Sequence, residues 1–338
     1  MINKKKVILI LSMLSICFGG TCQDMQFTQF NAAPLYLNPG FTGATAAHRF
    51  ASNYRNQWAA ISGHFVGYTF AYDYNLSEFN SGVGLLFARE QAGSASLGNT
   101  EIGLLYSYHI RIDRKIFVQP ALKINYVTRG VDFNKLVFND QLARGGSDNT
   151  TADDIQLNTA RYADFTAGLL VYSKDYWAGV SFNHINEPNQ SLGDGDSPLY
   201  MKFSAHGGYK FNLSERGGRR VLNSTYINVV AHYKSQQKFD QLDLGLYYTR
   251  DPLVFGLWYR GIPMIKSQNN VLNNDAVAIV LGYKLSDYNL NIGYSYDVTI
   301  SRLAVNSAGS HEISLVYEVA SKKKKRKRRK FFVPCAKF

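Results

Sequence analysis

Apolar and aromatic residues occupy every second position in many segments of this chain, from about Phe65 to Val319. Such a segment forms a strand with one apolar and one polar face, because successive side chains point to opposite sides of the backbone. The clearest example is 66–74, and the pattern returns at 241–249 and 289–297. Alternation over about ten residues is typical of strands that face lipid on one side and a polar lumen on the other.

Alternation occurs in soluble sandwiches as well as in membrane barrels, so strand length matters. A sandwich strand usually has about 5–6 residues, whereas many segments here have about 10–14, near the roughly 9–11 tilted residues that cross a bilayer. Aromatic residues make up 14% of the chain, with 23 Tyr and 21 Phe, and amphipathic rings gather at membrane interfaces. We therefore predict an all-β fold, a closed antiparallel transmembrane β-barrel.

Counting the alternating segments predicts about 14 strands, within a range of 12 to 16. An even number of strands closes an antiparallel sheet without an exposed edge. It also places both chain termini on the same side of the membrane. The predicted strands are 49–60, 64–75, 81–91, 99–112, 116–129, 161–173, 176–186, 200–213, 224–235, 238–250, 253–260, 275–286, 288–300 and 310–319.

The connections between these strands alternate in length, as in bacterial barrels with short periplasmic turns and long outer loops. We therefore predict an outer-membrane location with the N- and C-termini in the periplasm. The connection at 214–223 is an exception, because it is longer than a periplasmic turn needs to be. The tight turns lie around 77–80, 112–115, 174–175, 251–252 and 286–287, and the long connections include 130–160, 187–199, 261–274 and 301–309.

Residues 1–22 have the pattern of a secretory signal peptide. Three lysines at 4–6 precede an apolar stretch at 7–18, and small residues lie just before Cys22. The apolar stretch is shorter than the roughly 18 residues of a spanning helix. Lipidation of Cys22 stays open as an alternative to simple cleavage, although the aliphatic residue expected three positions upstream is missing.

Residues 23–48 have a different character from the strands that follow. Pro34 and Pro39 interrupt regular structure, yet the segment contains several aromatic side chains that need a surface to pack on. We predict that it forms a plug in the lumen or lies against the periplasmic mouth. The barrel would then span 49–320, followed by a basic tail at 321–338.

The formal charge of +12 is concentrated at the two ends of the chain, and the body is close to neutral. We therefore expect no nucleic-acid partner for this exported barrel. The cationic run near the C-terminus is either a solvated tail or an electrostatic tether to anionic lipid headgroups, cell-wall polymer or an acidic partner. The residues of this candidate periplasmic tether are Lys322, Lys323, Lys324, Lys325, Arg326, Lys327, Arg328, Arg329 and Lys330.

No motif in the sequence predicts catalysis or a cofactor. His311 and Glu312 begin like a zinc-protease helix, but position 315 is Leu and the segment alternates as a strand. The acidic, glycine-rich stretch at 193–197 lacks the spaced ligands of a calcium loop. We predict that the protein is not an enzyme and binds no metal or cofactor.

Several short motifs follow one another along most of the chain. They are Gln26–Phe30, Ala33–Gly43, Tyr54–Trp58, Asp164–Gly168, Trp177–His184, Gln241–Gly245, Gly256–Arg260, Gly293–Asp297 and Gly309–Ile313. Together they closely resemble the PorP/SprF family of the type IX secretion system. The chain departs from the family pattern at Gly40, where Ala is more usual, and in its basic tail.

The resemblance implies an outer-membrane protein of Bacteroidetes that helps to export proteins with a C-terminal sorting domain and to retain them on the cell surface. Gliding adhesins are among such cargo in motile species. The resemblance also implies contacts with outer-membrane lipid and with periplasmic and motor-coupled components of the apparatus. A transport channel resembling the fatty-acid transporters is the alternative function.

Ionisable and aromatic residues within these motifs are candidates for a lumenal network or for partner binding. An unpaired charge in a narrow barrel is costly, and amphipathic rings suit membrane interfaces. The candidates are Tyr54, Arg55, Trp58, Asp243, Arg260, Asp297 and Glu312.

Overall fold

The computed structural model describes residues 24–45, 48–132, 135–136, 139–143, 158–213, 225–266, 272–300 and 307–319. The predicted signal peptide at 1–22, the connection at 214–223 and the basic tail at 321–338 lie outside the described residues. No helix in the described part of the chain is long and apolar enough to cross a membrane.

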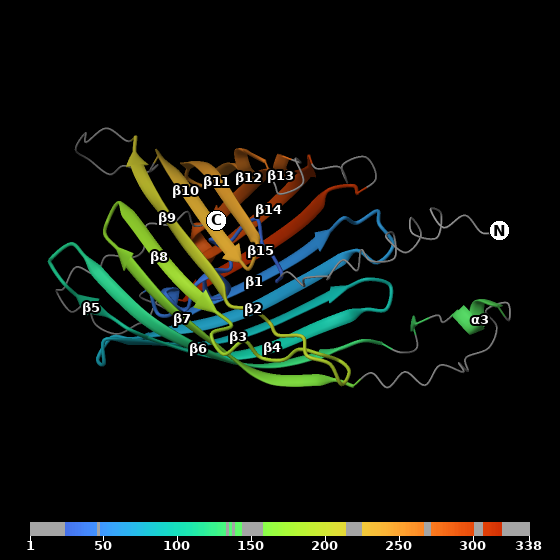
Figure 1. The fold of residues 1–338 in the computed structure, drawn as a ribbon. Helices are drawn as coiled ribbons and strands as arrows, with labels where there is room; N and C mark the ends of the chain where they lie inside the picture. The colour runs from blue at the N-terminus through green and yellow to red at the C-terminus, as the bar shows by residue number, and fades with distance from the viewer. Residues whose placement is uncertain are drawn as a thin grey trace.

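The strands form one closed antiparallel sheet (Figure 1). Each strand pairs with its neighbours along the chain, and β1 (His48–Gln57) pairs with β15 (Ser310–Val319) to complete the ring. The two-residue strand β5 (Ile110–Arg111) continues β4 (Leu97–Tyr108) along the same partner, β6 (Phe117–Gly130), so β4 and β5 together act as one strand of the barrel. The prediction of a closed barrel with about fourteen strands is confirmed.

The strands have the following bounds: β1 (His48–Gln57), β2 (Phe65–Leu76), β3 (Ser81–Ala92), β4 (Leu97–Tyr108), β5 (Ile110–Arg111), β6 (Phe117–Gly130), β7 (Ala160–Tyr172), β8 (Tyr176–Asn183), β9 (Lys202–Asn212), β10 (Thr225–Gln236), β11 (Phe239–Arg250), β12 (Leu253–Lys266), β13 (Leu272–Leu285), β14 (Leu290–Thr299) and β15 (Ser310–Val319). Two short helices, α3 (Asn139–Ala143) and the 3₁₀ helix η3 (Ser286–Tyr288), lie in connections.

The largest difference from the predicted boundaries is in β12, which the alternation ends at residue 260. The strand continues to Lys266, but its pairing with β13 shifts register on both sides of Gly261. Gly261 has a φ of 137°, a conformation that residues with a side chain rarely adopt. The irregularity disturbs the two-residue period, and for this reason the sequence pattern stops before the strand does.

The two faces of the barrel wall differ as the alternation predicts. In β6, Leu122 is 61% exposed on the outer face, while its neighbour Lys123 is 5% exposed on the lumen side. Ile124 and Tyr126 continue the apolar outer face, and Asn125 lies on the lumen side. The outer face suits lipid, and the inner face needs polar partners.

The two ends of the barrel carry different connections. At the end where β1 begins and β15 finishes, strands are joined by short connections such as 77–80, 173–175 and 251–252. We call this the short-turn end. The opposite end, here called the long-loop end, carries the connections 131–159 and 184–201 together with some tight turns.

Residues 24–45, here called the lumenal segment, run through the inside of the barrel (Figure 1). The segment contains a single helical turn, α2 (Pro34–Leu37), and the 3₁₀ helix η1 (Pro39–Phe41). Both helices begin with proline, which fits the first turn because that position needs no intrahelical N–H bond. The Asn38 side chain accepts a hydrogen bond from the backbone N–H of Gly40 at 2.7 Å and so caps η1.

The lumenal segment supplies much of the apolar core. Phe30 packs edge-on against Trp258 of β12, with ring centroids 4.8 Å apart. Phe41 packs against Trp177 of β8 at 5.6 Å, and Leu35 is completely buried. The segment therefore contacts two separate parts of the wall, β8 and β12, through aromatic side chains.

The segment crosses the lumen from one end of the barrel to the other. Asp24 contacts Lys202, which begins β9 at the long-loop end. Gly43 bonds to Asp73, which lies near the short-turn end of β2. Asp24 and Val319 therefore lie at opposite ends of the barrel. The two termini, predicted to lie in the periplasm, are outside the described residues. The even strand count fixes only where β1 begins and β15 finishes.

Candidate functional site

Four of the candidate residues form a buried charge cluster in the lumen. Register places Arg55 of β1 directly opposite Glu312 of β15, and the Arg55 Nη1 lies 3.2 Å from the Glu312 Oε2. The Arg55 Nη2 lies 2.7 Å from the Asp297 Oδ2 of β14. Arg260 of β12 adds a contact of 3.3 Å from its Nη1 to the same Asp297 oxygen. All four side chains are buried.

Asp243 of β11 extends this cluster around the wall. Its carboxylate lies 3.6 Å from the Arg260 Nε and 3.3 Å from the Lys234 Nζ. The ring of His232 approaches it at 3.8 Å. We call these five residues the charge cluster: Arg55, Asp243, Arg260, Asp297 and Glu312.

The charge cluster holds the lumenal segment through Thr28. The Thr28 hydroxyl donates to the Asp297 Oδ2 at 2.6 Å and accepts from the Arg55 Nη1 at 2.5 Å and the Arg260 Nη2 at 2.9 Å. The backbone N–H of Thr28 donates to the Glu312 Oε2 at 2.7 Å. Both carboxylates and both guanidinium groups therefore bind the segment as well as each other.

Gln29 continues this attachment into the wall. Its backbone N–H donates to the Glu312 Oε1 at 3.0 Å, and its side-chain Nε2 donates to the Ser295 Oγ at 3.2 Å. The Ser314 hydroxyl donates to the Gln29 Oε1 at 2.6 Å. A Cβ added to Gly293 would lie 2.3 Å from that same oxygen. A larger residue at 293 would thus push Gln29 out of its place.

The other two candidates, Tyr54 and Trp58, lie apart from the charge cluster. Tyr54 is 45% exposed on the outer face, because alternation turns it outward when Arg55 points inward. Trp58 follows the end of β1, where its ring packs edge-on against Phe65 at 5.4 Å. Tyr54 thus faces outward, whereas Trp58 lines a cavity at the long-loop end.

The segment is also fixed near the short-turn end. The Asn38 Nδ2 donates to the backbone carbonyl of Val180 at 3.0 Å. Arg49 and Asp73 form a buried pair at 2.7 Å, and the same Asp73 accepts from the backbone N–H of Gly43 at 2.8 Å. The Arg49 Nη2 donates to the Phe41 carbonyl at 2.9 Å.

A third attachment, here called the Asp24 clasp, comprises Asp24, Asp164, His184 and Lys202. The His184 Nε2 lies 3.0 Å from the Asp24 Oδ2, and its Nδ1 lies 3.0 Å from the Asp164 Oδ1. Lys202 forms a second ion pair with Asp24. An imidazole between two carboxylates can donate to both only when it is protonated.

The protonation of the clasp follows from its charges. Burial by itself would lower the pKa of His184, but the charge of Asp24 and hydrogen bonds to Asp164 and Asp24 outweigh it and raise the pKa to about 9. Burial would raise the pKa of Asp24, but Lys202 and His184 hold it well below its ordinary value. The clasp is therefore an ionic contact at neutral pH.

The sequence reasoning missed the Asp24 clasp and Thr28. Asp164 and His184 lie within motifs that carry the family resemblance, and Asp164 occupies an inward position of its strand by alternation. That position could have marked Asp164 as a buried charge in need of a partner. Nothing in the sequence marks Asp24 as the partner, because its place depends on the segment crossing the lumen.

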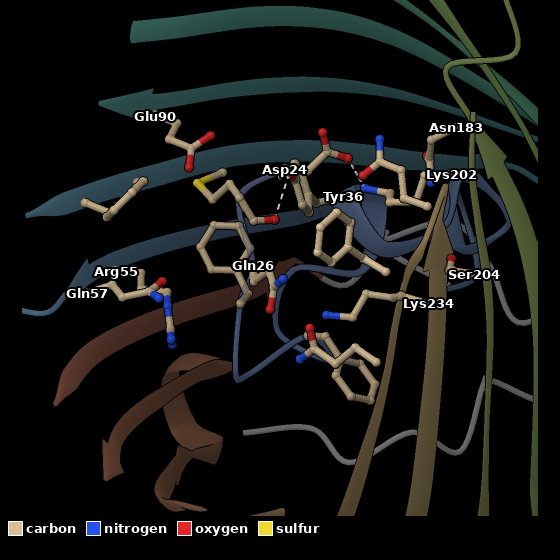
Figure 2. A pocket seen from close by; sticks show the side chains of 18 of the residues that line it. Asp24, Gln26, Tyr36, Arg55, Gln57, Glu90, Asn183, Lys202, Ser204 and Lys234 are labelled. Carbon is tan, nitrogen blue, oxygen red and sulfur yellow. Dashed lines mark hydrogen bonds and ion pairs between the residues drawn. The ribbon is translucent and has the colours of Figure 1, made fainter. Parts of the chain in front are cut away.

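A cavity of about 1570 Å³ lies between the start of the lumenal segment and the strand ends at the long-loop end. Figure 2 shows Gln26 and Lys234 pointing into this space, with Arg55 and Glu90 at its sides. The cavity carries both signs of charge and several aromatic rings. No group of three or more His, Cys, Asp and Glu residues in the described chain is arranged to hold a metal ion.

Comparison with known protein families gives a match over most of the chain. Residues 20–317 match the family described as "Type IX secretion system membrane protein PorP/SprF". The chain belongs to the PorP/SprF family. As a member of this family with a barrel fold, it is an outer-membrane component of the type IX secretion system. No curated protein sequence matches the chain significantly.

Solved structures similar to this PorP/SprF protein are membrane barrels of low sequence identity. The Pseudomonas putida toluene transporter TodX is 11% identical, with 84% of this chain and 93% of that chain covered and a TM-score of 0.47. The Acinetobacter baumannii outer membrane protein Omp33 is 8% identical, with coverage of 82% and 100% and a TM-score of 0.43.

Replacing Glu312 with Gln should loosen the lumenal segment. The change removes one of the two buried carboxylates that pair with Arg55. It also leaves one oxygen instead of two to accept hydrogen bonds from the N–H groups of Thr28 and Gln29. Breaking a buried ion pair typically costs about 3–5 kcal/mol. We expect the free energy of unfolding in lipid vesicles, measured by urea titration, to fall by that order for Glu312→Gln.

Asp275→Asn is the matched control for this change. Asp275 also contacts a guanidinium, at 3.6 Å from the Arg260 Nη1, but its side chain is 39% exposed. An exposed pair is typically worth about 0–1 kcal/mol, so little change is expected. Equal losses for the two variants would contradict the account of the charge cluster.

The Asp24 clasp should loosen at high pH. The pKa of His184 is about 9 in the folded protein, above its ordinary value near 6.5. Its stabilising contribution is therefore complete below about pH 6.5 and is lost as the pH rises through 9. A nitroxide attached at Met25→Cys, with Cys335→Ser, should gain mobility between pH 7 and 10 in electron paramagnetic resonance.

His184→Gln serves as the control for this titration. Its neutral amide does not titrate, so nitroxide mobility should be higher at pH 7 and almost constant up to pH 10. An unchanged titration in His184→Gln would show that another group controls the segment.

Proposed function

We propose that this protein is a non-enzymatic outer-membrane component that binds an exported protein with a C-terminal sorting domain, such as a gliding adhesin. It links that cargo to the secretion or gliding apparatus. The observation that carries the proposal is the family match, which extends over residues 20–317 and so includes both the lumenal segment and nearly the whole barrel.

The filled lumen supports a binding role over the alternative of a transport channel. The lumenal segment is attached at three places along the barrel, by the Asp24 clasp, the charge cluster and the Arg49–Asp73 pair. Moving it aside to open a path would leave Arg55, Asp297 and Glu312 without their contacts to Thr28. Uncompensated buried charges are costly, so the segment is a poor gate for rapid passage.

The orientation of the barrel follows the usual asymmetry of bacterial barrels. Long loops face the cell exterior and short turns face the periplasm. On this basis the cavity at the long-loop end faces outward, where exported cargo is retained. The short-turn end, where β15 finishes, then faces the periplasmic components.

The ionisable groups of the lumen support a structural role over a catalytic one. Arg55, Arg260, Asp297 and Glu312 are engaged with each other and with the lumenal segment. A general acid or base needs access to its substrate, whereas these groups are buried between wall and segment.

Direct binding tests the proposed function. The purified protein in lipid nanodiscs should bind a fusion protein that ends in a sorting domain, and should not bind the same fusion without that domain. Planar bilayers provide the companion measurement, in which we expect no steady conductance. Conductance or uptake of hydrophobic ligands, together with no affinity for sorting domains, would support the channel instead.

The basic run from Lys322 to Lys330 lies outside the described residues. We propose that it acts as an electrostatic tether in the periplasm, because it follows β15, which finishes at the short-turn end. Clustered cations steer acidic partners toward a surface. Such a tether would strengthen the link to the periplasmic apparatus without taking part in the barrel.

Deleting residues 322–338 should leave the barrel assembled but weaken its association with the periplasmic apparatus. Association of the full chain should fall with added salt, because exposed charges are screened over about 8–10 Å at physiological ionic strength. Co-purification at two salt concentrations measures this. Unchanged association would make the run a solvated end, and failed membrane assembly would assign it to insertion.

A further inference from the structure

Residues 24–27 form one wall of the large cavity, and several of their backbone N–H and carbonyl groups have no hydrogen-bond partner among the described residues. The Met25 carbonyl accepts from the Tyr36 hydroxyl at 3.0 Å. Within the described residues, no partner contacts the backbone N–H of Met25, Gln26 or Phe27, or the carbonyl of Gln26 or Phe27. Free main-chain groups beside a cavity can pair with a second polypeptide.

The side chains around the cavity fit peptide groups. Many of them are amides, which donate and accept hydrogen bonds without adding charge. Aromatic rings from the segment and from the rim add apolar surface for side chains of a guest. The amides include Gln26, Asn99 and Asn183, and the rings include Phe27, Tyr36 and Trp58.

Buried polar atoms on the cavity wall lack partners. The His232 Nε2, the Arg55 Nε and the Asn99 Oδ1 have no hydrogen-bond partner among the described residues, and all three residues line the cavity. His232 is 6% exposed and Arg55 is 3% exposed. Buried polar groups are normally satisfied, so the wall of the cavity has hydrogen-bonding capacity that the described residues do not use.

The size of the cavity favours a chain over a small molecule. Its volume of about 1570 Å³ exceeds the roughly 300–1,000 Å³ of typical small-molecule pockets. Charges of both signs line it, among them Asp24, Glu90, Lys202 and Lys234. A cavity without a dominant charge does not select a simple anion or cation.

We propose that the cavity receives an extended segment of the exported polypeptide, which lies against residues 24–27 and pairs with their main-chain groups. This inference rests on the proposed function and names the contact by which cargo is held. Main-chain pairing supplies affinity for any sequence, and the rings and amides select among side chains. The lumenal segment would thus be part of the binding site as well as a plug.

Filling the cavity is the first test. Asn99 lies on the cavity side of β4, whereas Thr100 is the next residue and points to the opposite face. Asn99→Trp should weaken the affinity for a sorting-domain fusion by about tenfold or more, equivalent to about 1.4 kcal/mol. Thr100→Trp adds the same bulk outside the lumen and should change affinity by less than about twofold.

Removing one main-chain donor is the second test. Gln26→Pro deletes the free backbone N–H of Gln26, and Gln26→Ala removes the same side chain while keeping that donor. We expect a larger loss of affinity for the proline variant. The shift of the folded barrel on an unheated gel verifies that both variants assemble.

A photo-crosslinking residue at position 26 identifies the occupant. A crosslink to the sorting-domain fusion supports the inference. A crosslink only within the chain itself would mean that its own residues fill the cavity, and capture of a lipid or glycan would assign the cavity to that ligand. Either result overturns the inference.

The tests separate this inference from the proposed function. If the unmodified protein captures the fusion but Asn99→Trp and Gln26→Pro bind as well as their controls, cargo binds elsewhere and only the inference fails. If the unmodified protein shows no affinity for the fusion in the same assay, the proposed function fails.

Discussion

The structure depends on the pairing of charges inside a narrow barrel. Arg55, Asp297 and Glu312 project from neighbouring strands into the lumen, where all three side chains are buried. Contacts among the wall residues do not satisfy every donor and acceptor of these three side chains. Thr28 of the lumenal segment adds one hydrogen bond to each of them. Because removing one partner from a buried ionic group is far more costly than losing a surface contact, the wall and the lumenal segment stabilise each other.

This mutual dependence explains why the lumen is unevenly filled. From Thr28 onward the lumenal segment is bonded to the wall or packed against it, with Phe30 and Phe41 lying on Trp258 and Trp177. Before Thr28, Asp24 is held to His184 and Lys202, and residues 25–27 lie beside open space. The cavity is thus confined to the long-loop end, where a partner can reach it without displacing the buried contacts. Plugging and binding are therefore compatible in one short segment.

Local patterns predicted the wall well and the lumen only in part. The motifs marked Arg55, Asp297 and Glu312 as candidates for a lumenal network, and all three occupy inward positions of their alternating strands. Alternation turns Tyr54 outward, although the motif drew attention to it as a candidate. The sequence could not predict the Asp24 clasp, because the contact between Asp24 and His184 joins residues 160 positions apart. Neither period nor spacing predicts that an irregular segment crosses the lumen to the opposite end.

The central claim is that the lumenal segment is a fixed part of the barrel interior. Hydrogen exchange of the folded protein in lipid, followed by mass spectrometry, tests it without any substitution. The amides of residues 35–44 should exchange as slowly as those of the neighbouring strands β6 and β7. Nearly all of these residues are buried, and most of their N–H groups donate to acceptors within the segment or, at Gly43, to Asp73 of β2. The exposed turn at 193–196 provides the fast reference. Exchange of residues 35–44 at the rate of that turn would contradict the account.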